Sequence, residues 1–455
     1  MKGTEIELDR CVLVGTLDAG VHAFLGVPYA EAPVGSLRFA PPRAAHLEGR
    51  IDASTKREML PQGPSDLDRP MGPLELPQNE GALTVCVWTP DTKAKAKLPV
   101  AVWLHGGANF CGAGAAPWYD GAALARTQGI VVVGVNYRLG ALGFLQSPGL
   151  NDRNLAIEDQ LEALRWVRRS IAAFGGDPEA VTVFGQSAGA NAIVHMLGLP
   201  EAEGLFRRAW LLSPSIGRGN FTAEEAREVS RTLLTELGVD PKDEARVLER
   251  VREKTAADIL AATDGAFAKL APKFGGMLFR PVKDAWATPE SSIAAAAAGA
   301  AKKGVEVVVG TTLEETLAFS ADRSPAALEK LHAVQRDRFD LPAWDFAAAL
   351  SSAGVPVRKY RFTWRAPDSV YGSCHCVDLP FLFGTFRSWR APMLAGLTEH
   401  DGAALTRMLG RDFGAFVRGE ALPDHWPQWR ADAPVHRVYA AAGAALEALP
   451  REAFN

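Results

Sequence analysis

Cysteine is scarce in this chain, and its number is odd. The 455 residues include five cysteines: Cys11, Cys86, Cys111, Cys374 and Cys376. A disulfide-stabilised secreted protein usually carries a larger, even set, so this count favours a reducing compartment. Cys374 and Cys376 flank His375, but no second cysteine–histidine pair has the spacing that would complete a four-ligand zinc site. We therefore expect no disulfide framework, no metal and no cofactor.

An excess of charge of one sign is also missing. The chain has 49 Lys and Arg against 53 Asp and Glu, a net charge of −4. This balance argues against nucleic acid or an anionic membrane as a partner. No apolar run reaches the length that spans a bilayer. The opening MKGTEIELDR lacks the apolar core of a secretory signal, and the chain starts at Met1, so we expect a cytoplasmic protein.

Internal repeats and low-complexity linkers are absent as well. The composition, 47% hydrophobic and 22% charged, is ordinary for a globular protein. Length alone would allow two or three domains. Because no segment marks a boundary, we expect a single domain over residues 1–455, with insertions.

Apolar runs typical of strands buried on both faces alternate with helical periodicity. We predict helices over Gly121–Thr127 and Glu158–Phe174. The predicted strands are Pro99–Gly107, Ile130–Gly140, Ala180–Ser187, Arg207–Ser213, Val305–Gly310 and Val357–Trp364. Strands that alternate with helices predict an α/β fold, with a mostly parallel sheet covered on both faces.

Three segments break this alternation. The stretch up to Arg43 has antiparallel hairpin character, and Leu60–Gln78 is a Pro-, Gly- and Asp-rich surface loop. Thr222–Ala262 is amphipathic and helical, and alanine-rich Ser292–Ala301 follows it. We interpret residues 222–301 as a helical insertion, a position from which such segments often cover a site.

A serine stands inside a G-x-S-x-G motif at Gly185–Gly189. The bare motif should occur by chance in roughly one chain in ten at this glycine content. Here the strand-like run Ala180–Phe184 precedes it and the helix-like run Ala188–Leu197 follows it. A tight strand-to-helix turn holds a serine hydroxyl clear of the sheet, so the context predicts Ser187 as a nucleophile.

A serine hydroxyl needs a base, and the base needs an acid to orient it. In sheets of this kind the chain order is serine, acid, histidine. His375 fits, because it lies in a loop of small residues just after the predicted strand Val357–Trp364. Glu314 and Glu315 follow the preceding strand, and chemistry alone leaves both open as the acid.

Acyl transfer also needs backbone N–H groups that face the developing oxyanion. The glycine-rich turn His105–Asn109 follows the strand Pro99–Leu104, where such donors belong. The N–H of Ala188, directly after the nucleophile, is a further donor. An ordinary strand-exit turn is the competing interpretation of His105–Asn109.

The sequence resembles type-B carboxylesterases of the α/β-hydrolase superfamily, relatives of cholinesterases and of bacterial para-nitrobenzyl-type esterases. The resemblance covers nearly the whole chain. It rests on Phe24–Pro42, Leu83–Pro90, Val102–Phe110, Tyr119–Ala125, Asn136–Phe144, Asp159–Val167, Phe174–Ala190 and Leu205–Ser213. It implies Glu315 as the acid, His375 as the base, and Gly107, Ala108 and Ala188 as oxyanion donors.

Several positions depart from the family pattern. Leu60 and Ala82 replace the cysteines of a family disulfide, and the loop between them has no tryptophan. Gln186 precedes the nucleophile where cholinesterases have glutamate. Without these groups we do not expect choline esters as substrates. Cys376 replaces the glycine that follows the family's catalytic histidine, and GTTLEET stands for its G-T-N-x-D-E-G segment.

We therefore expect an enzyme that hydrolyses small-molecule carboxylic esters through an acyl-enzyme. The same triad could act on carbamate, lactone, amide or thioester bonds. A non-catalytic binding or adhesion member of the fold is a further alternative. The candidates for pocket lining, each aromatic with core packing as its competing role, are Asn109, Phe110, Trp118, Gln186, Phe279 and Phe381.

Overall fold

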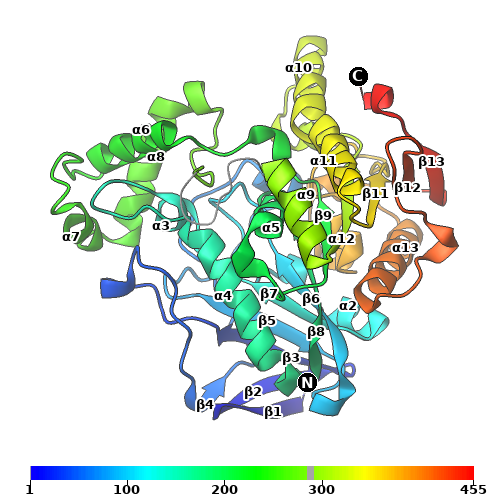
Figure 1. The fold of residues 1–455 in the computed structure, drawn as a ribbon, viewed down its shortest axis with the longest axis horizontal. Helices are drawn as coiled ribbons and strands as arrows, with labels where there is room; N and C mark the ends of the chain where they lie inside the picture. Colours follow the sequence, from blue (N-terminus) through cyan, green and yellow to red (C-terminus); the bar gives the residue numbers. More distant parts are fainter. Residues whose placement is uncertain (1, 284–291, 455) are drawn as a thin grey trace.

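A mixed β-sheet crosses the molecule from end to end and carries helices on both faces (Figure 1). The structure is a computed structural model that describes residues 2–283 and 292–454. In the described residues the strand order is β1-β2-β3-β5-β7-β6-β8-β9-β10-β11-β12-β13, with β4 beside β2. The predicted α/β fold is confirmed.

The parallel part of the sheet contains the six strands that the sequence predicts. Neighbours from β7 to β12 pair in parallel. These strands are β7 (Val131–Val135), β6 (Leu98–Leu104), β8 (Gly176–Gln186), β9 (Arg208–Leu212), β10 (Glu306–Thr312), β11 (Val357–Phe362) and β12 (Val435–Ala440). Of these, β12 had not been predicted.

Antiparallel strands extend the sheet at both ends. The expected N-terminal hairpins are present, because β1 pairs with β2 and β2 with β3 in antiparallel register. The strands outside the parallel part are β1 (Lys2–Leu8), β2 (Arg10–Asp18), β3 (Val21–Pro28), β4 (Glu48–Asp52), β5 (Thr84–Thr89) and β13 (Gly443–Ala448).

Strand β6 shows how one run of apolar residues serves both faces. Val100, Val102 and Leu104 pack into one hydrophobic cluster, while Ala101 and Trp103 pack into another. The first cluster includes side chains of α4 (Leu155–Ser170), α5 (Ala188–Gly198), α9 (Ser292–Lys303) and α11 (Leu341–Ser352). The second includes those of α2 (Ala122–Gln128), α12 (Leu379–Leu382) and α13 (Glu399–Arg418). A continuous apolar strand therefore indicates burial on both sides.

The helices α6 (Ala223–Glu236), α7 (Val247–Arg252) and α8 (Ala256–Phe274) form a group to one side of the sheet (Figure 1). They pack with α3 (Gly140–Phe144) in a third hydrophobic cluster. By contrast α9 contacts α5 and α11, and so lies in the layer against the sheet. Residues 284–291 of the predicted insertion lie outside the described residues, and the division into a domain with an insertion stays a prediction.

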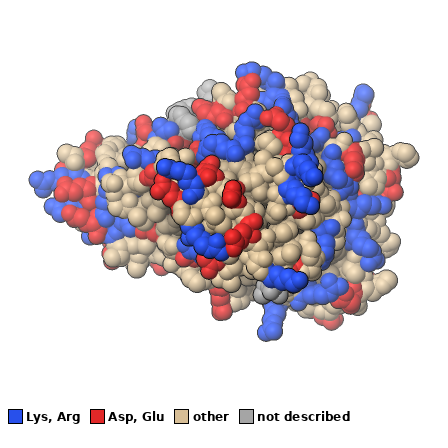
Figure 2. Space-filling view, turned by 90° about the horizontal axis from the view of Figure 1, so that it is seen from below, with Lys and Arg blue, Asp and Glu red and all other residues tan. Residues whose placement is uncertain are grey.

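Two α-helices of the described residues remain. The short helix α1 (Asp68–Met71) lies in the predicted surface loop, and α10 (Pro325–Gln335) lies in the C-terminal half of the chain. In the described part of the chain, no helix is both long and apolar enough to cross a membrane. Figure 2 shows Lys and Arg interspersed with Asp and Glu over one face of the molecule, in keeping with the balanced composition.

Lys359 is buried in β11, and burial lowers its pKa to about 7 from an ordinary value of 10.5. Between these values the unfolded chain binds the extra proton, so the free energy of unfolding should rise with pH from about 7 to 10.5. Lys359→Met should raise that free energy by about 2–4 kcal/mol at pH 6 and flatten the rise. Urea unfolding across this range tests it, with exposed Lys302→Met as the control; equal slopes in wild type and Lys359→Met would contradict it.

Candidate active site

Ser187 occupies a strained turn between β8 and α5. Its backbone has φ 54° and ψ −118°, in the positive-φ region that residues with a side chain rarely adopt. The Ser187 N–H donates to the carbonyl of Leu212 in β9 at 2.9 Å, and the N–H of Asn191 donates to the Ser187 carbonyl at 2.9 Å. The turn is therefore held from both sides, as expected of a nucleophile elbow.

Close packing explains both glycines of the motif. A Cβ on Gly189 would lie 2.1 Å from the carbonyl oxygen of Leu104, and one on Gly185 would lie 2.7 Å from the carbonyl carbon of Gly189. Backbone atoms cannot move aside as a flexible side chain can. Glycine at these positions lets α5 start directly against β6.

Gly189→Ala should therefore destabilise the fold strongly. The new methyl group must push β6 and α5 apart, and overpacking against backbone costs about 3 kcal/mol of unfolding free energy. The midpoint of urea unfolding measures the loss. Gly3→Ala is a matched control, because no heavy atom lies within 4 Å of a Cβ there. Equal midpoints for the two variants would contradict the packing argument.

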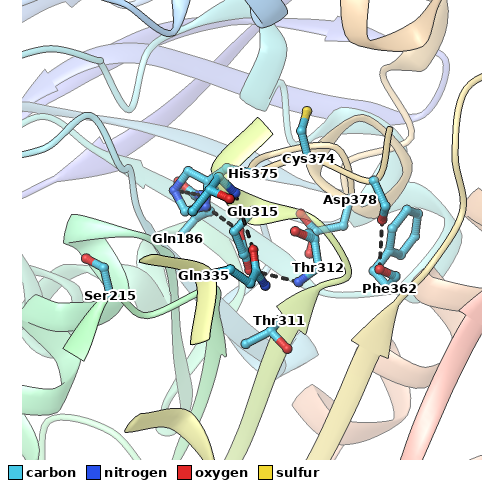
Figure 3. A network of polar contacts seen from close by, with 12 residues as sticks. Gln186, Ser215, Thr311, Thr312, Glu315, Gln335, Phe362, Cys374, His375 and Asp378 are labelled. Atoms are coloured by element: carbon cyan, nitrogen blue, oxygen red, sulfur yellow. Dashed lines mark hydrogen bonds and ion pairs between the residues drawn. The ribbon is translucent and has the colours of Figure 1, made fainter. Parts of the chain in front are cut away.

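Glu315 and His375 form a buried pair at the carboxyl ends of β10 and β11 (Figure 3). His375 Nδ1 lies 2.5 Å from Glu315 Oε2, and both side chains are 0% exposed. The second carboxylate oxygen, Oε1, accepts the N–H of Thr312 at 2.8 Å. The His375 N–H donates to the Glu315 carbonyl at 3.2 Å. These contacts fix the orientation of the imidazole.

Glu314, next to Glu315 in the sequence, binds residues other than His375. Arg365 donates to both Glu314 carboxylate oxygens, at 2.8 and 2.9 Å, and the Ser373 N–H donates to Oε2 at 2.9 Å. The geometry therefore separates two carboxylates that the sequence left equivalent. Glu315 is placed against the histidine, and Glu314 forms a half-exposed ion pair that tethers the loop before His375.

The other ring nitrogen of the histidine faces Gln186 rather than the serine. His375 Nε2 lies 2.8 Å from Gln186 Nε2 (Figure 3). Ser187 is 7% exposed, and its hydroxyl has no hydrogen bond to any residue that the structure describes. The acid and base are thus brought together, while the contact from serine to base is not made in this state. Such contacts often tighten only when substrate is bound.

The turn after β6 presents free backbone donors. Gly107 has φ 111° and Ala108 has φ 53°, and a Cβ on Gly107 would lie 2.1 Å from the Cys111 carbonyl oxygen. Neither of their N–H groups meets an acceptor among the described residues. The N–H of Ala188, the first residue of α5, is among the four that a helix leaves without an internal acceptor.

Ser187, Gly107 and Ala108 all line one cavity of about 640 Å³. Helix α8 contributes much of the lining, with Ile259, Leu260 and Phe267 among its side chains. A second cavity of about 300 Å³ also reaches Gly107, together with Gln186, Trp118 and Cys376. Residues 63–65 and 67 of the predicted surface loop line both cavities, so this loop covers the site.

The predicted lining residues fall into three groups. Phe110 and Phe279 line the larger cavity, and Trp118 and Gln186 line the smaller one. Asn109 instead donates to the Phe279 carbonyl at 3.0 Å and lines a cavity of about 30 Å³ behind the elbow. Phe381 was wrongly expected in the pocket: it is buried between the rings of Phe362 and Trp364, with centroids at 5.7 and 5.2 Å.

Sequence reasoning missed three arginines and an aromatic ring close to this site. Arg338 and Phe319 line the larger cavity with Arg218, and Arg280 lies behind the elbow. No motif marks them. The one available signal was an arginine-containing segment, Arg336–Arg338, directly before the apolar helix at Leu341.

The loop around His375 buries several ionisable groups. Burial, followed by the charge of Glu315, raises the pKa of Asp378 to about 7, and the Tyr360 hydroxyl donates to that carboxyl at 2.9 Å. Cys374 and Cys376 are buried thiols, and burial raises the pKa of both. Cys376 has φ 73°, which explains why a glycine suits this position in the family.

The chain is similar in sequence to known carboxylesterases. The model of the carboxylesterase family matches residues 10–340. The chain is 38% identical over 451 residues to the probable N-octanoylanthranilate hydrolase AqdA2 of Rhodococcus erythropolis, covering 93% of each chain. It is 37% identical over 420 residues to para-nitrobenzyl esterase of Bacillus subtilis (strain 168), covering 85% of this chain and 84% of that one.

A solved structure of a thermophilic para-nitrobenzyl esterase superposes with a TM-score of 0.87 at 31% identity, covering 99% of each chain. The expected class of enzyme, a carboxylic ester hydrolase that works on small-molecule esters, is confirmed by these likenesses. The chain belongs to the carboxylesterase family.

Proposed function

We propose that Ser187, His375 and Glu315 hydrolyse carboxylic esters in two steps. The observation that carries the proposal is the buried Glu315–His375 pair at the edge of the sheet where the elbow serine faces a cavity. Ser187 is the nucleophile, His375 takes its proton, and Glu315 holds the imidazole and balances its charge.

In the first step the Ser187 hydroxyl turns toward His375 and forms a hydrogen bond to Nε2, in place of the amide of Gln186. Its Oγ attacks the ester carbonyl, and the oxyanion accepts hydrogen bonds from the N–H groups of Gly107, Ala108 and Ala188. His375 then gives its proton to the leaving alcohol. Water repeats the sequence on the acyl-enzyme and releases the acid.

The two cavities that meet at Gly107 supply space for the two sides of the ester bond. We propose that the larger cavity, with Phe110 and Phe279 on its wall, takes the bulkier side. A panel of 4-nitrophenyl and alkyl esters that varies acyl and alcohol length separately tests this. Ser187→Ala serves as the control for background hydrolysis. An equally small limit of length on the acyl side and on the alcohol side would contradict this assignment of the larger cavity.

A second candidate reaction is cleavage of an N-acyl bond. It is favoured by the relative whose name is probable N-octanoylanthranilate hydrolase, 38% identical to this chain. The same three residues would act, because amide and ester hydrolysis share the tetrahedral intermediate. Matched octanoyl anilide and octanoyl phenyl ester substrates distinguish the two reactions.

We also propose that the protein works in the cytoplasm. All five cysteines are free and buried, and Leu60 and Ala82, at the positions of a family disulfide, pack in one hydrophobic cluster. This arrangement suits a reducing compartment. Fractionation of the source cells tests the location.

A further inference from the structure

Three arginines lie beside the active site. They are Arg218 at the end of the 3-10 turn η6 (Ile216–Arg218), Arg280, and Arg338 in the π-helical turn η8 (Arg336–Asp340). None forms an ion pair with an Asp or Glu in the part of the chain that the structure describes. The Nε atom of each is buried and lacks a hydrogen-bond partner among those residues.

The direct contacts of these guanidinium groups are with aromatic rings and carbonyl oxygens rather than with carboxylates. Arg338 lies over the rings of Phe319 and Phe339, at 5.1 and 5.2 Å from the centroids. Arg280 lies 4.7 Å over the ring of Phe221 and donates to the carbonyl of Arg218 at 3.3 Å. Aromatic faces and carbonyls orient these cations. The charges of Glu315 and Glu225 act on Arg338 and Arg280 respectively, but neither carboxylate forms an ion pair with them in the described structure.

The arginines also repel one another. Burial, followed by the charges of Arg218 and Arg280, lowers the pKa of Arg338 to about 9. Burial and the charge of Arg280 lower the pKa of Arg218 to about 10. Positive charge therefore gathers in a partly desolvated place. A carboxylate bound there would form charge-assisted hydrogen bonds with these guanidinium groups.

Two of the three arginines lie in the same cavity as the proposed nucleophile. Arg218 and Arg338 line the 640 Å³ cavity that also contains Ser187. The Phe319 ring that supports Arg338 lies 5.2 Å from the His375 ring, so one aromatic side chain separates the cation from the base. The acidic residues of the same cavity, Asp66 and Asp264, are both exposed.

We propose that this cavity selects esters that carry a carboxylate on the part of the molecule seated in it, with Arg338 and Arg218 as the groups that bind that carboxylate. Guanidinium groups match the two oxygens of a carboxylate, and Arg280 adds to the positive potential. The inference rests on the proposed function, because it names the substrate class of the same site.

A pair of substrates that differ in one charge tests the proposal. The 4-nitrophenyl monoester of glutaric acid carries a free carboxylate, and 4-nitrophenyl methyl glutarate is its neutral match. We expect wild-type kcat/KM to favour the acid over the methyl ester by at least about tenfold. Arg338→Gln and Arg218→Gln should each lower this ratio about tenfold, with Arg338→Lys intermediate. Exposed Arg231→Gln, on α6, should not change it.

A binding measurement separates failure of this inference from failure of the esterase mechanism. In the Ser187→Ala variant, saturating glutarate should raise Tm by at least about 2 °C and dimethyl glutarate should not. Adding Arg338→Gln should remove the rise. Neutral esters hydrolysed with no preference for the acid, and no glutarate effect on Tm, would overturn the inference alone. Hydrolysis that persists unchanged in Ser187→Ala would instead overturn the proposed mechanism.

Discussion

Replacing Ser187 with alanine is expected to lower kcat/KM for a chromogenic ester by at least about 10⁴-fold. The side chain stands at φ 54° on an elbow held by Leu212 and Asn191, and its hydroxyl faces the larger cavity with no competing hydrogen bond in the described structure. Residual turnover would come only from the donors and from binding.

Ser215 offers a matched control for this variant. It is a second buried serine close to the elbow (Figure 3). Its hydroxyl accepts a hydrogen bond from the Asn191 amide at 3.0 Å. Ser215→Ala should stay within about threefold of wild-type kcat/KM. Circular dichroism and urea unfolding should report a folded Ser187→Ala protein. Activity retained in Ser187→Ala, or lost equally in Ser215→Ala, would mean that another residue is the nucleophile.

Glu315→Gln should lower kcat by about 10²- to 10⁴-fold, the range expected when the triad acid loses its charge. The carboxylate accepts from two sides at once, His375 Nδ1 at 2.5 Å and the Thr312 N–H at 2.8 Å. A glutamine has one acceptor oxygen, so its amide group must face one of these donors. The imidazole would then change its tautomer or its orientation, and the imidazolium would lose its counter-charge at a buried position.

The adjacent residue provides the comparison. Glu314→Gln removes a carboxylate that is one position away but pairs with Arg365 and the Ser373 N–H. We expect its kcat to fall by less than about tenfold, through loosening of the loop before His375. Steady-state kinetics of both variants on one ester give the contrast. A larger loss for Glu314→Gln would exchange the roles of the two residues.

Much of the fold and part of the site could be predicted from local sequence patterns. The continuous apolar runs located β6 to β11 within a few residues, because strands buried on both faces need no polar alternation. Ser187 and His375 followed from a motif and from chain order. Strands β12 and β13 and helices α10, α11 and α13 were not predicted.

The identity of the acid, part of the pocket lining and the arginine cluster depend on contacts between residues far apart in the sequence. Glu314 and Glu315 differ because residues far along the chain bind them: Arg365 pairs with Glu314, and His375 pairs with Glu315. Phe381 has the composition of a pocket residue and becomes core because the rings of Phe362 and Trp364 enclose it. The arginines at 218, 280 and 338 meet only after the chain folds, with η6 against η8. No pattern within one segment predicts such a convergence.

Covalent labelling tests the central claim, that Ser187 is the nucleophile, most directly. Diethyl 4-nitrophenyl phosphate should form one phosphorus–oxygen bond to Ser187 Oγ and release one 4-nitrophenolate per protein chain, with loss of all esterase activity. Peptide mass spectrometry should find the diethylphosphoryl group on Ser187 and none on Ser187→Ala. A label on another residue that abolishes activity, or full activity in a protein labelled at Ser187, would contradict the account.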